Sequence, residues 1–195
     1  MDRSTLLGMT MGAAVMFGFG IVWLLIGLLR GRRTPAGIWI SLLVVGIALG
    51  ASITVLFTRA AGIPRDAIPL SEQQIAVNHE IAWHFYVIFG VELAAIFVAV
   101  VVLKAIHYAD YILCGIALIV GVHFIPLAAL FRAPMYYVTG FLGCVIGLVG
   151  FWVADSGLRQ KVVGISFGLL LWETAALITW LGLSASRFVG RLPPM

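Results

Sequence analysis

The chain has 195 residues, of which 63% are apolar and 10% are charged, and its formal net charge is +4 at pH 7. Together with a mean hydropathy of +1.13, this composition excludes a water-soluble globular domain, in which about half of the residues are apolar. The basic residues lie mostly at the ends of apolar segments, where they suit phospholipid headgroups, and no nucleic-acid binding is predicted. The sequence is typical of a polytopic membrane protein embedded in a lipid bilayer.

Six apolar segments are each long enough to cross a bilayer as a helix, which takes roughly 20 residues. Each segment is continuous over several helical turns, whereas a membrane β-strand alternates apolar and polar residues. The predicted fold is therefore all-α, a polytopic transmembrane six-helix bundle that forms a single domain over residues 1–195. The spans are expected at about residues 6–29, 36–58, 80–103, 109–131, 135–154 and 162–185.

The connections between these spans are short, with one exception at residues 59–79. GRRTPA, KAIHYAD, RAPM and DSGLRQK are expected as loops. Residues 59–79 contain two prolines and predict an irregular segment, followed either by a short interfacial piece or by an early start of the third span near Ser71. An even number of spans places both termini on one face. Lys and Arg are divided evenly between the two faces, so only the RGRR cluster favours a cytoplasmic first loop.

The two halves of the chain, residues 1–104 and 105–195, resemble each other. VELAAI in the third span and WETAALI in the sixth align Glu92 with Glu173, and Gly46 falls on Gly147. A repeat of three spans must insert in opposite senses, which is the inverted arrangement of many secondary transporters. The bundle is therefore built either from two inverted three-helix repeats or without internal symmetry.

Two glutamates and two histidines lie well inside the predicted spans, and they are the candidates for a substrate or proton pathway: Glu92, Glu173, His123 and His84. At about 1.5 Å per residue, they fall within a slab roughly 12 Å thick, so one interior site could contain all of them. A carboxylate in hydrocarbon costs several kcal/mol unless it is neutral, paired or hydrated. The alternative interpretation is structural, with these side chains hydrogen-bonding neighbouring helices together. Three further polar residues are expected at the membrane rim: Glu80, His79 and Arg132.

His123 interrupts the apolar run IVGVHFIPLAALFRAP in the fourth span. Pro126 lacks an N–H, so the carbonyl of Val122 loses its usual helical donor and the span can bend there. His123 either donates to a carbonyl of a neighbouring helix or takes part in binding. Both interpretations predict that its side chain faces the protein interior, because lipid offers an imidazole no hydrogen-bond partner.

Other residues predict packing and anchoring rather than an activity. Aromatic residues near span ends are expected in the aromatic belts at the membrane surfaces: Trp23, Trp39, Trp180, Tyr136 and Tyr137. Four glycine pairs have the spacing that lets helices approach closely: Gly8/Gly12, Gly46/Gly50, Gly143/Gly147 and Gly164/Gly168. They predict a tight bundle and are compatible with a homodimer through glycine-rich helix faces. Cys114 and Cys144 lie at different depths and are expected to be packing residues.

The sequence lacks the motifs of several common enzymes and binding sites. It has no GxxxxGK[ST] phosphate loop, no CxxC, no HExxH and no G-x-S-x-G, and no cofactor is predicted. The leading hypothesis is a proton- or ion-coupled carrier, in which Glu92 and Glu173 bind and release a proton while the histidines line the path. A structural or regulatory membrane subunit without transport activity is the alternative. An intramembrane enzyme or metal site built from the same His and Glu residues is the third, although they lack the i, i+3 or i, i+4 spacing of metal ligands.

The stretch VGVHFIPLAALFRAPMYYVTG is similar to a segment of uncharacterised bacterial integral membrane proteins, in which HFxPLAxxF precedes an aromatic-rich turn and a glycine-rich span. The resemblance covers about a third of the chain. It implies a multi-pass protein of six helices in the prokaryotic plasma membrane, the inner membrane. It implies no activity for any residue.

Overall fold

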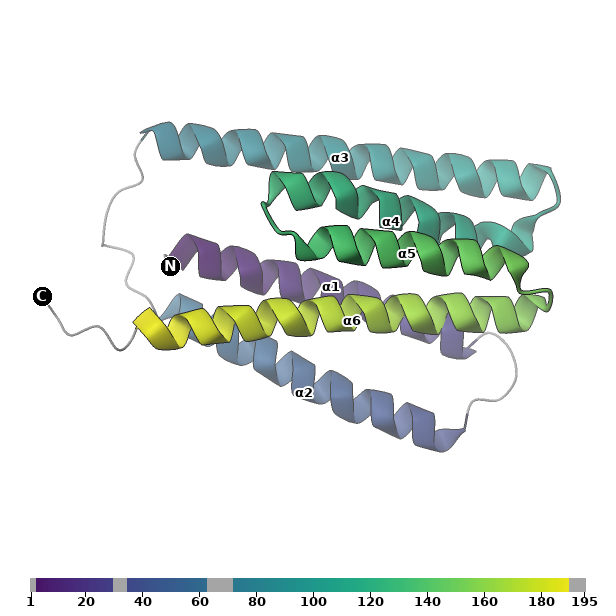
Figure 1. The fold of residues 1–195 in the computed structure, drawn as a ribbon, viewed down its shortest axis with the longest axis horizontal. Coiled ribbons are helices and arrows are strands. Elements are labelled where there is room, and N and C mark those ends of the chain that lie inside the picture. Colours follow the sequence, from purple (N-terminus) through teal and green to yellow (C-terminus); the bar gives the residue numbers. More distant parts are fainter. Residues whose placement is uncertain (1–2, 30–34, 63–71, 190–195) are drawn as a thin grey trace, which may run out of the picture. The chain divides into compact units, whose positions relative to one another are not determined.

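The computed structural model describes residues 3–29, 35–62 and 72–189, and their regular structure is entirely helical (Figure 1). In chain order the elements are α1 (Arg3–Leu29), α2 (Ala36–Ala61), α3 (Glu72–Ala105), the short 3₁₀ helix η1 (Ala109–Tyr111), α4 (Ile112–Leu130), α5 (Met135–Trp152) and α6 (Ser156–Val189). The six α-helices are each long and apolar enough to cross a membrane. The predicted all-α, six-span fold is therefore confirmed, and the chain is a multi-pass membrane protein.

Two helices begin earlier than the hydropathy predicts. α3 begins at Glu72, which supports the early start predicted near Ser71, whereas residues 63–71 of the long connection lie outside the described residues. α6 begins at Ser156 rather than near residue 162, so most of the expected loop DSGLRQK is helix.

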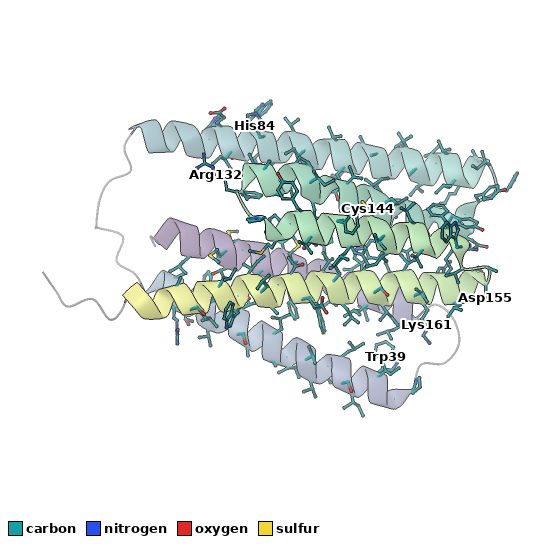
Figure 2. The ribbon with its side chains drawn as sticks, in the orientation of Figure 1. Trp39, His84, Arg132, Cys144, Asp155 and Lys161 are labelled. Carbon is teal, nitrogen blue, oxygen red and sulfur yellow. The ribbon has the colours of Figure 1, made fainter. Side chains whose placement is uncertain are left out.

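The first turn of α6 forms because its polar groups have partners. Asp155 caps the helix, since its Oδ1 accepts a hydrogen bond of 2.6 Å from the backbone N–H of Leu158. Arg159 donates from Nε to the carbonyl of Val153 (2.9 Å) and from Nη2 to that of Ala154 (3.2 Å). Arg159 is only 3% exposed, so this charge is accommodated inside the protein at the α5–α6 turn, where Figure 2 labels Asp155.

The chain divides into two compact units. Unit 1 comprises Met1–Val22, Arg33–Pro69 and Leu171–Met195, and unit 2 comprises Trp23–Arg32 and Leu70–Leu170. Two of the six helices contribute to both units, because α1 is divided after Val22 and α6 after Leu170.

In unit 1, α1 and α2 pack against the last turns of α6. Leu6, Leu56 and Ala60 form a buried cluster, against which Leu7 and Leu183 pack. The beginning of α1 thus lies beside the ends of α2 and α6, as expected for an even number of spans.

A second contact in unit 1 joins the middle parts of the same three helices. The Trp172 indole stacks on Phe17 with ring centroids 5.5 Å apart, and its Nε1–H donates to the Phe17 carbonyl at 3.2 Å. Gly46 of α2 leaves room for this indole, because a Cβ there would lie 2.9 Å from the Trp172 ring. The absence of a side chain at Gly46 therefore lets α2 approach α6 closely.

In unit 2, α3, α4 and α5 lie side by side and alternate in direction (Figure 1). Glycines bring α4 and α5 together, because a Cβ on Gly121 would lie 2.6 Å from the Cys144 backbone nitrogen. Gly147 packs against Leu118 in the same way, and Gly150 against Cys114. These three contacts join the first half of α4 to the second half of α5, and Gly140 continues them toward Phe124 of α4. We call this contact, made by Gly121, Gly140, Gly147 and Gly150, the glycine seam.

The glycine pairs named above mostly pack helices within the chain. Gly143 leaves room for Phe167, and Gly164 lies against Gly27, where a Cβ would be 2.6 Å from the Gly27 Cα. A Cβ on Gly8, in contrast, would have nothing within 4 Å. The expected close packing is therefore present at Gly46, Gly143, Gly147 and Gly164, whereas a Cβ on Gly50 would make only ordinary contact with Phe17 at 3.6 Å.

Two of the expected membrane-surface aromatics are core residues instead. Trp23 is 6% exposed and stacks on Phe167, with ring centroids 4.4 Å apart. Tyr136 is 8% exposed and packs against Phe124 and Phe131. Tyr137 and Trp180 are exposed, as expected of belt residues. Proximity to a span end therefore did not distinguish a ring that anchors in the headgroups from one that fills the core.

Candidate functional site

The candidate site is a contact between Glu92 of α3 and His123 of α4. The carboxylate Oε2 of Glu92 lies 3.4 Å from Nδ1 of His123, and each side chain is only 9% exposed. Within the described part of the chain, this Nδ1 is buried and makes no hydrogen bond. The two groups are thus near enough for an ion pair, but the ring nitrogen has no aligned partner. The imidazole also has a backbone hydrogen-bond partner on α3, Ile88, one turn before Glu92.

Both residues lie near the middle of their helices. Glu92 is at the midpoint of the apolar span His79–Ala105, and His123 lies within the span Ala109–Leu130. At about 1.5 Å per residue, His123 is roughly 5 Å from the midpoint of its span. The contact is therefore inside the hydrocarbon region, where water cannot stabilise an unpaired charge.

Packing on both sides of the contact fixes the register of α3 against α4. Phe85 of α3 lies near Phe131 of α4, with ring centroids 6.1 Å apart, toward one end. Toward the other end, a Cβ on Gly115 of α4 would lie 3.3 Å from Leu103 of α3. Because the helices are antiparallel, these contacts bring Glu92 and His123 to the same level.

Sequence reasoning missed the residues that position His123. A Cβ on Gly140 of α5 would lie 2.7 Å from the Gly121 carbonyl and 3.1 Å from the Phe124 Cβ. The glycine seam therefore holds the stretch of α4 that carries His123 directly against α5. A signal was present, because Gly140 precedes Gly143, Gly147 and Gly150 at helical spacing, although only Gly143 and Gly147 were recognised as a pair.

His84 does not join the site. Its side chain is exposed (Figure 2), and its Nδ1 lies 2.8 Å from the backbone carbonyl of Glu80. His84 thus contacts the main chain of Glu80, one turn earlier on its own helix. A histidine that bonds its own helix in this way needs no partner on another helix.

The three residues expected at the membrane rim lie near the ends of α3 and α4. His79 and Glu80 are exposed at the beginning of the apolar part of α3. Arg132 is exposed just after α4 and has a left-handed backbone with φ of 51°. Because α3 and α4 are antiparallel, all three lie at the same end of unit 2.

Glu173 belongs to unit 1, whereas Glu92 and His123 belong to unit 2. Its side chain is exposed on α6, between the buried Trp172 and the buried Thr174. The two glutamates that the sequence aligns therefore have different surroundings, one against an imidazole and the other exposed. The inverted repeat stays a prediction, namely that residues 1–104 and 105–195 superpose.

The contact can hold and exchange a proton, because it joins a carboxylate to an imidazole. A metal ion would need more ligands, and among the described residues no three His, Cys, Asp or Glu side chains come together. Cys114 and Cys144 are free thiols that pack along the glycine seam, and the Cys144 Sγ lies 3.9 Å from the Leu118 carbonyl. Their place in the seam agrees with the packing role that was expected of them.

No protein-family model, curated protein or solved structure matches the chain.

Proposed function

We propose that the chain is a proton-coupled membrane carrier in which Glu92 and His123 together bind the coupling proton. The observation that supports this proposal is the 3.4 Å contact between the two side chains. It lies inside the bilayer, where a carboxylate and an imidazole are each costly to bury without a purpose or a partner.

The chemistry of the pair suits reversible proton binding. Imidazole changes its charge near neutral pH, and a carboxylate in contact with it can accept or supply the same proton. The pair has a net charge of zero with one proton and −1 without it. In a medium of low dielectric constant this difference is energetically large, so loading or releasing the proton can drive a conformational step.

The position of the pair connects proton binding to helix contacts. Glu92 is on α3 and His123 is on α4, so every change in the charge of the pair acts on the contact between these helices. A carrier requires such a coupling, because the proton must alter which side of the protein is open. The proposed location, the prokaryotic plasma membrane, provides a proton gradient as the energy source.

Proton binding can be tested without knowing the transported solute. Infrared spectra of the protein in lipid, recorded over a series of pH values, should contain a carboxyl band that titrates and that disappears in Glu92→Gln. Glu80→Gln is the matched control, because Glu80 is an exposed glutamate on the same helix. Its spectra should keep the titrating band. A titration that is identical in wild type and Glu92→Gln would contradict the assignment.

Transport is then tested in liposomes that contain a pH-sensitive dye, with an imposed pH gradient and a panel of inorganic cations, organic acids and amines outside. A solute that the carrier accepts should accelerate the collapse of the gradient. Glu92→Gln and His123→Leu should abolish this effect, whereas Glu80→Gln should retain it.

The structural alternative makes a different prediction for the double variant Glu92→Leu/His123→Leu. Replacing both partners with apolar residues removes the buried polar groups together, so the protein should stay folded under either hypothesis. Under the carrier hypothesis this folded protein has lost all solute-dependent proton movement. Under the structural hypothesis, the folded double variant keeps the function of the membrane subunit.

A further inference from the structure

The contact between α3 and α4 in unit 2 has two different ends. At one end, which we call the turn end, residues 106–111 join α3 directly to α4 (Figure 1). At the other end, which we call the rim end, the apolar part of α3 begins and α4 stops, and Glu80 and Arg132 are exposed there. The Glu92–His123 pair lies between the two ends, and each end offers it a different route to water.

The turn end is held closed by the chain itself. His107 has a left-handed backbone with φ of 64°, and the N–H of Tyr108 donates a hydrogen bond of 2.7 Å to the carbonyl of Leu103. A Cβ on Gly115 would lie 3.3 Å from Leu103, so α4 approaches α3 closely just inside this turn. Separating the two helices here would break these contacts and stretch a short connection.

The rim end is held more loosely. Phe85 of α3 and Phe131 of α4 meet with ring centroids 6.1 Å apart, and Phe131 is 45% exposed. In the chain, α2 precedes α3 and α5 follows α4, so no connection joins α3 to α4 at this end. Movement of α3 away from α4 therefore meets less resistance at the rim end than at the turn end.

Both helices have a weak point on the rim side of the pair. Gly90 lies just before Glu92, and a Cβ there would meet nothing within 4 Å, so packing does not require a glycine at this position. Glycine lowers the stability of a helix because it leaves the backbone more conformations. Pro126, which follows His123 in α4, leaves the carbonyl of Val122 without its helical donor. At about 1.5 Å per residue, Gly90 and Pro126 lie at nearly the same depth on the two facing helices.

Polar groups continue from the pair toward the rim end only. Residues 93–103 of α3 and 112–122 of α4, which lead to the turn end, contain no charged and no hydroxyl side chain. Toward the rim end, α3 carries His84, and Arg132 follows α4. The carbonyl of Val122 also points this way, because the carbonyls of a helix point toward its C-terminal end. Polar groups of this kind are tolerated at membrane depth where they line water.

We infer that the coupling proton reaches the Glu92–His123 pair from the rim end, through an opening formed when the part of α3 before Gly90 moves away from the end of α4. Phe85 and Phe131 close this route in the structure. The glycine seam holds α4 against α5, so α3 is the helix that moves. This inference rests on the proposed function, since it assigns the side from which the same proton site is filled.

Thiol labelling on both sides of Glu92 tests this route. Ile88→Cys and Ile96→Cys are a matched pair, because both positions are half-buried isoleucines of α3, one turn before and one turn after Glu92. The full chain in liposomes is exposed on both sides to a small cationic methanethiosulfonate that does not dissolve in the bilayer. It should modify Ile88→Cys several times faster than Ile96→Cys. The wild-type chain, treated identically, gives the background from Cys114 and Cys144.

A second comparison tests the weak point at Gly90. Gly90→Ala should slow the labelling of Ile88→Cys by about fivefold, because alanine stabilises the straight helix against bending. Gly18→Ala in α1 is the matched control, since a Cβ there also has nothing within 4 Å. It should leave the labelling of Ile88→Cys unchanged.

The infrared titration of Glu92, recorded on the same membranes, separates the failure of this inference from that of the proposed function. If Glu92 titrates but Ile96→Cys is labelled as fast as Ile88→Cys, or neither is labelled, the proton uses another route and only this inference is wrong. Labelling of Ile88→Cys that Gly90→Ala does not slow would overturn the assignment of the opening to Gly90. If the Glu92 band does not titrate, both proposals fail.

Discussion

The guanidinium of Arg159 lies 3.7 Å from the centroid of the Tyr111 ring, and this contact fastens the start of α6 to the turn before α4. The ring of Phe151 also stacks on Tyr111, with centroids 5.4 Å apart. A buried arginine is thus satisfied by an aromatic face and two backbone carbonyls.

Replacing Arg159 should destabilise the protein strongly. Arg159→Ala removes two charge-assisted hydrogen bonds and the aromatic contact, and it should lower the free energy of unfolding by roughly 2 kcal/mol or more. Tyr111→Phe keeps the ring and should be close to wild type, whereas Tyr111→Leu should resemble the arginine variant in direction. Thermal unfolding in detergent measures all three. An Arg159→Ala protein as stable as wild type would show that the contact contributes little.

Substitution within the glycine seam should separate α4 from α5. In Gly121→Ala the new methyl would meet the Cys144 backbone nitrogen at 2.6 Å and the Gly140 carbonyl at 3.0 Å, and backbone cannot move aside as a side chain can. We expect a loss of about 1–3 kcal/mol in the free energy of unfolding. Gly90→Ala is the matched control, because a Cβ there has nothing within 4 Å and alanine favours helix. Unfolding temperatures should therefore fall in the first variant and stay equal or rise in the second.

The Glu92–His123 contact should show energetic coupling in a double-mutant cycle. Each single change to Leu leaves the other polar group buried without its partner, which costs about 1–3 kcal/mol. The double change removes both groups, so its stability should lie closer to wild type than the sum of the single effects predicts. Additive effects of the two changes, measured by thermal unfolding in lipid, would mean that the side chains do not interact.

The indole of Trp172 should matter through its N–H as well as through its size. Trp172→Phe keeps an aromatic ring but loses the donor to the Phe17 carbonyl, at a cost of about 1 kcal/mol for the hydrogen bond plus the smaller ring. Trp180→Phe is the control, because Trp180 is 63% exposed. If the two variants unfold at the same temperature, the hydrogen bond of Trp172 makes no net contribution.

The sequence predicted helix positions well because bilayer thickness sets the length of an apolar segment. It failed at α6, where Arg159 and Lys161 made residues 156–161 look like a loop. Hydropathy scores a charged residue as exposed, and it has no means of recognising that an aromatic ring and two carbonyls surround Arg159.

The sequence predicted how deep in the membrane each candidate residue lies, but not on which side of its helix. Counting residues placed Glu92, His123, Glu173 and His84 in one slab, and the structure brings only Glu92 and His123 of these into contact. The side of a helix on which a residue lies depends on packing around the whole helix. In α4 that packing comes from the glycine seam, and in α6 from Trp172, neither of which hydropathy detects.

The glycine seam also has a mechanical consequence. At Gly121 and Gly140 the backbones of α4 and α5 meet directly, so the separation of these two helices is fixed there by main-chain atoms. In α3, by contrast, apolar side chains such as those of Val91 and Phe97 are 64% and 70% exposed. Phe85, Glu92 and Leu103 contact α4 at three separate points. Of these three points, only the Glu92–His123 contact, halfway along the apolar span of α3, depends on charge.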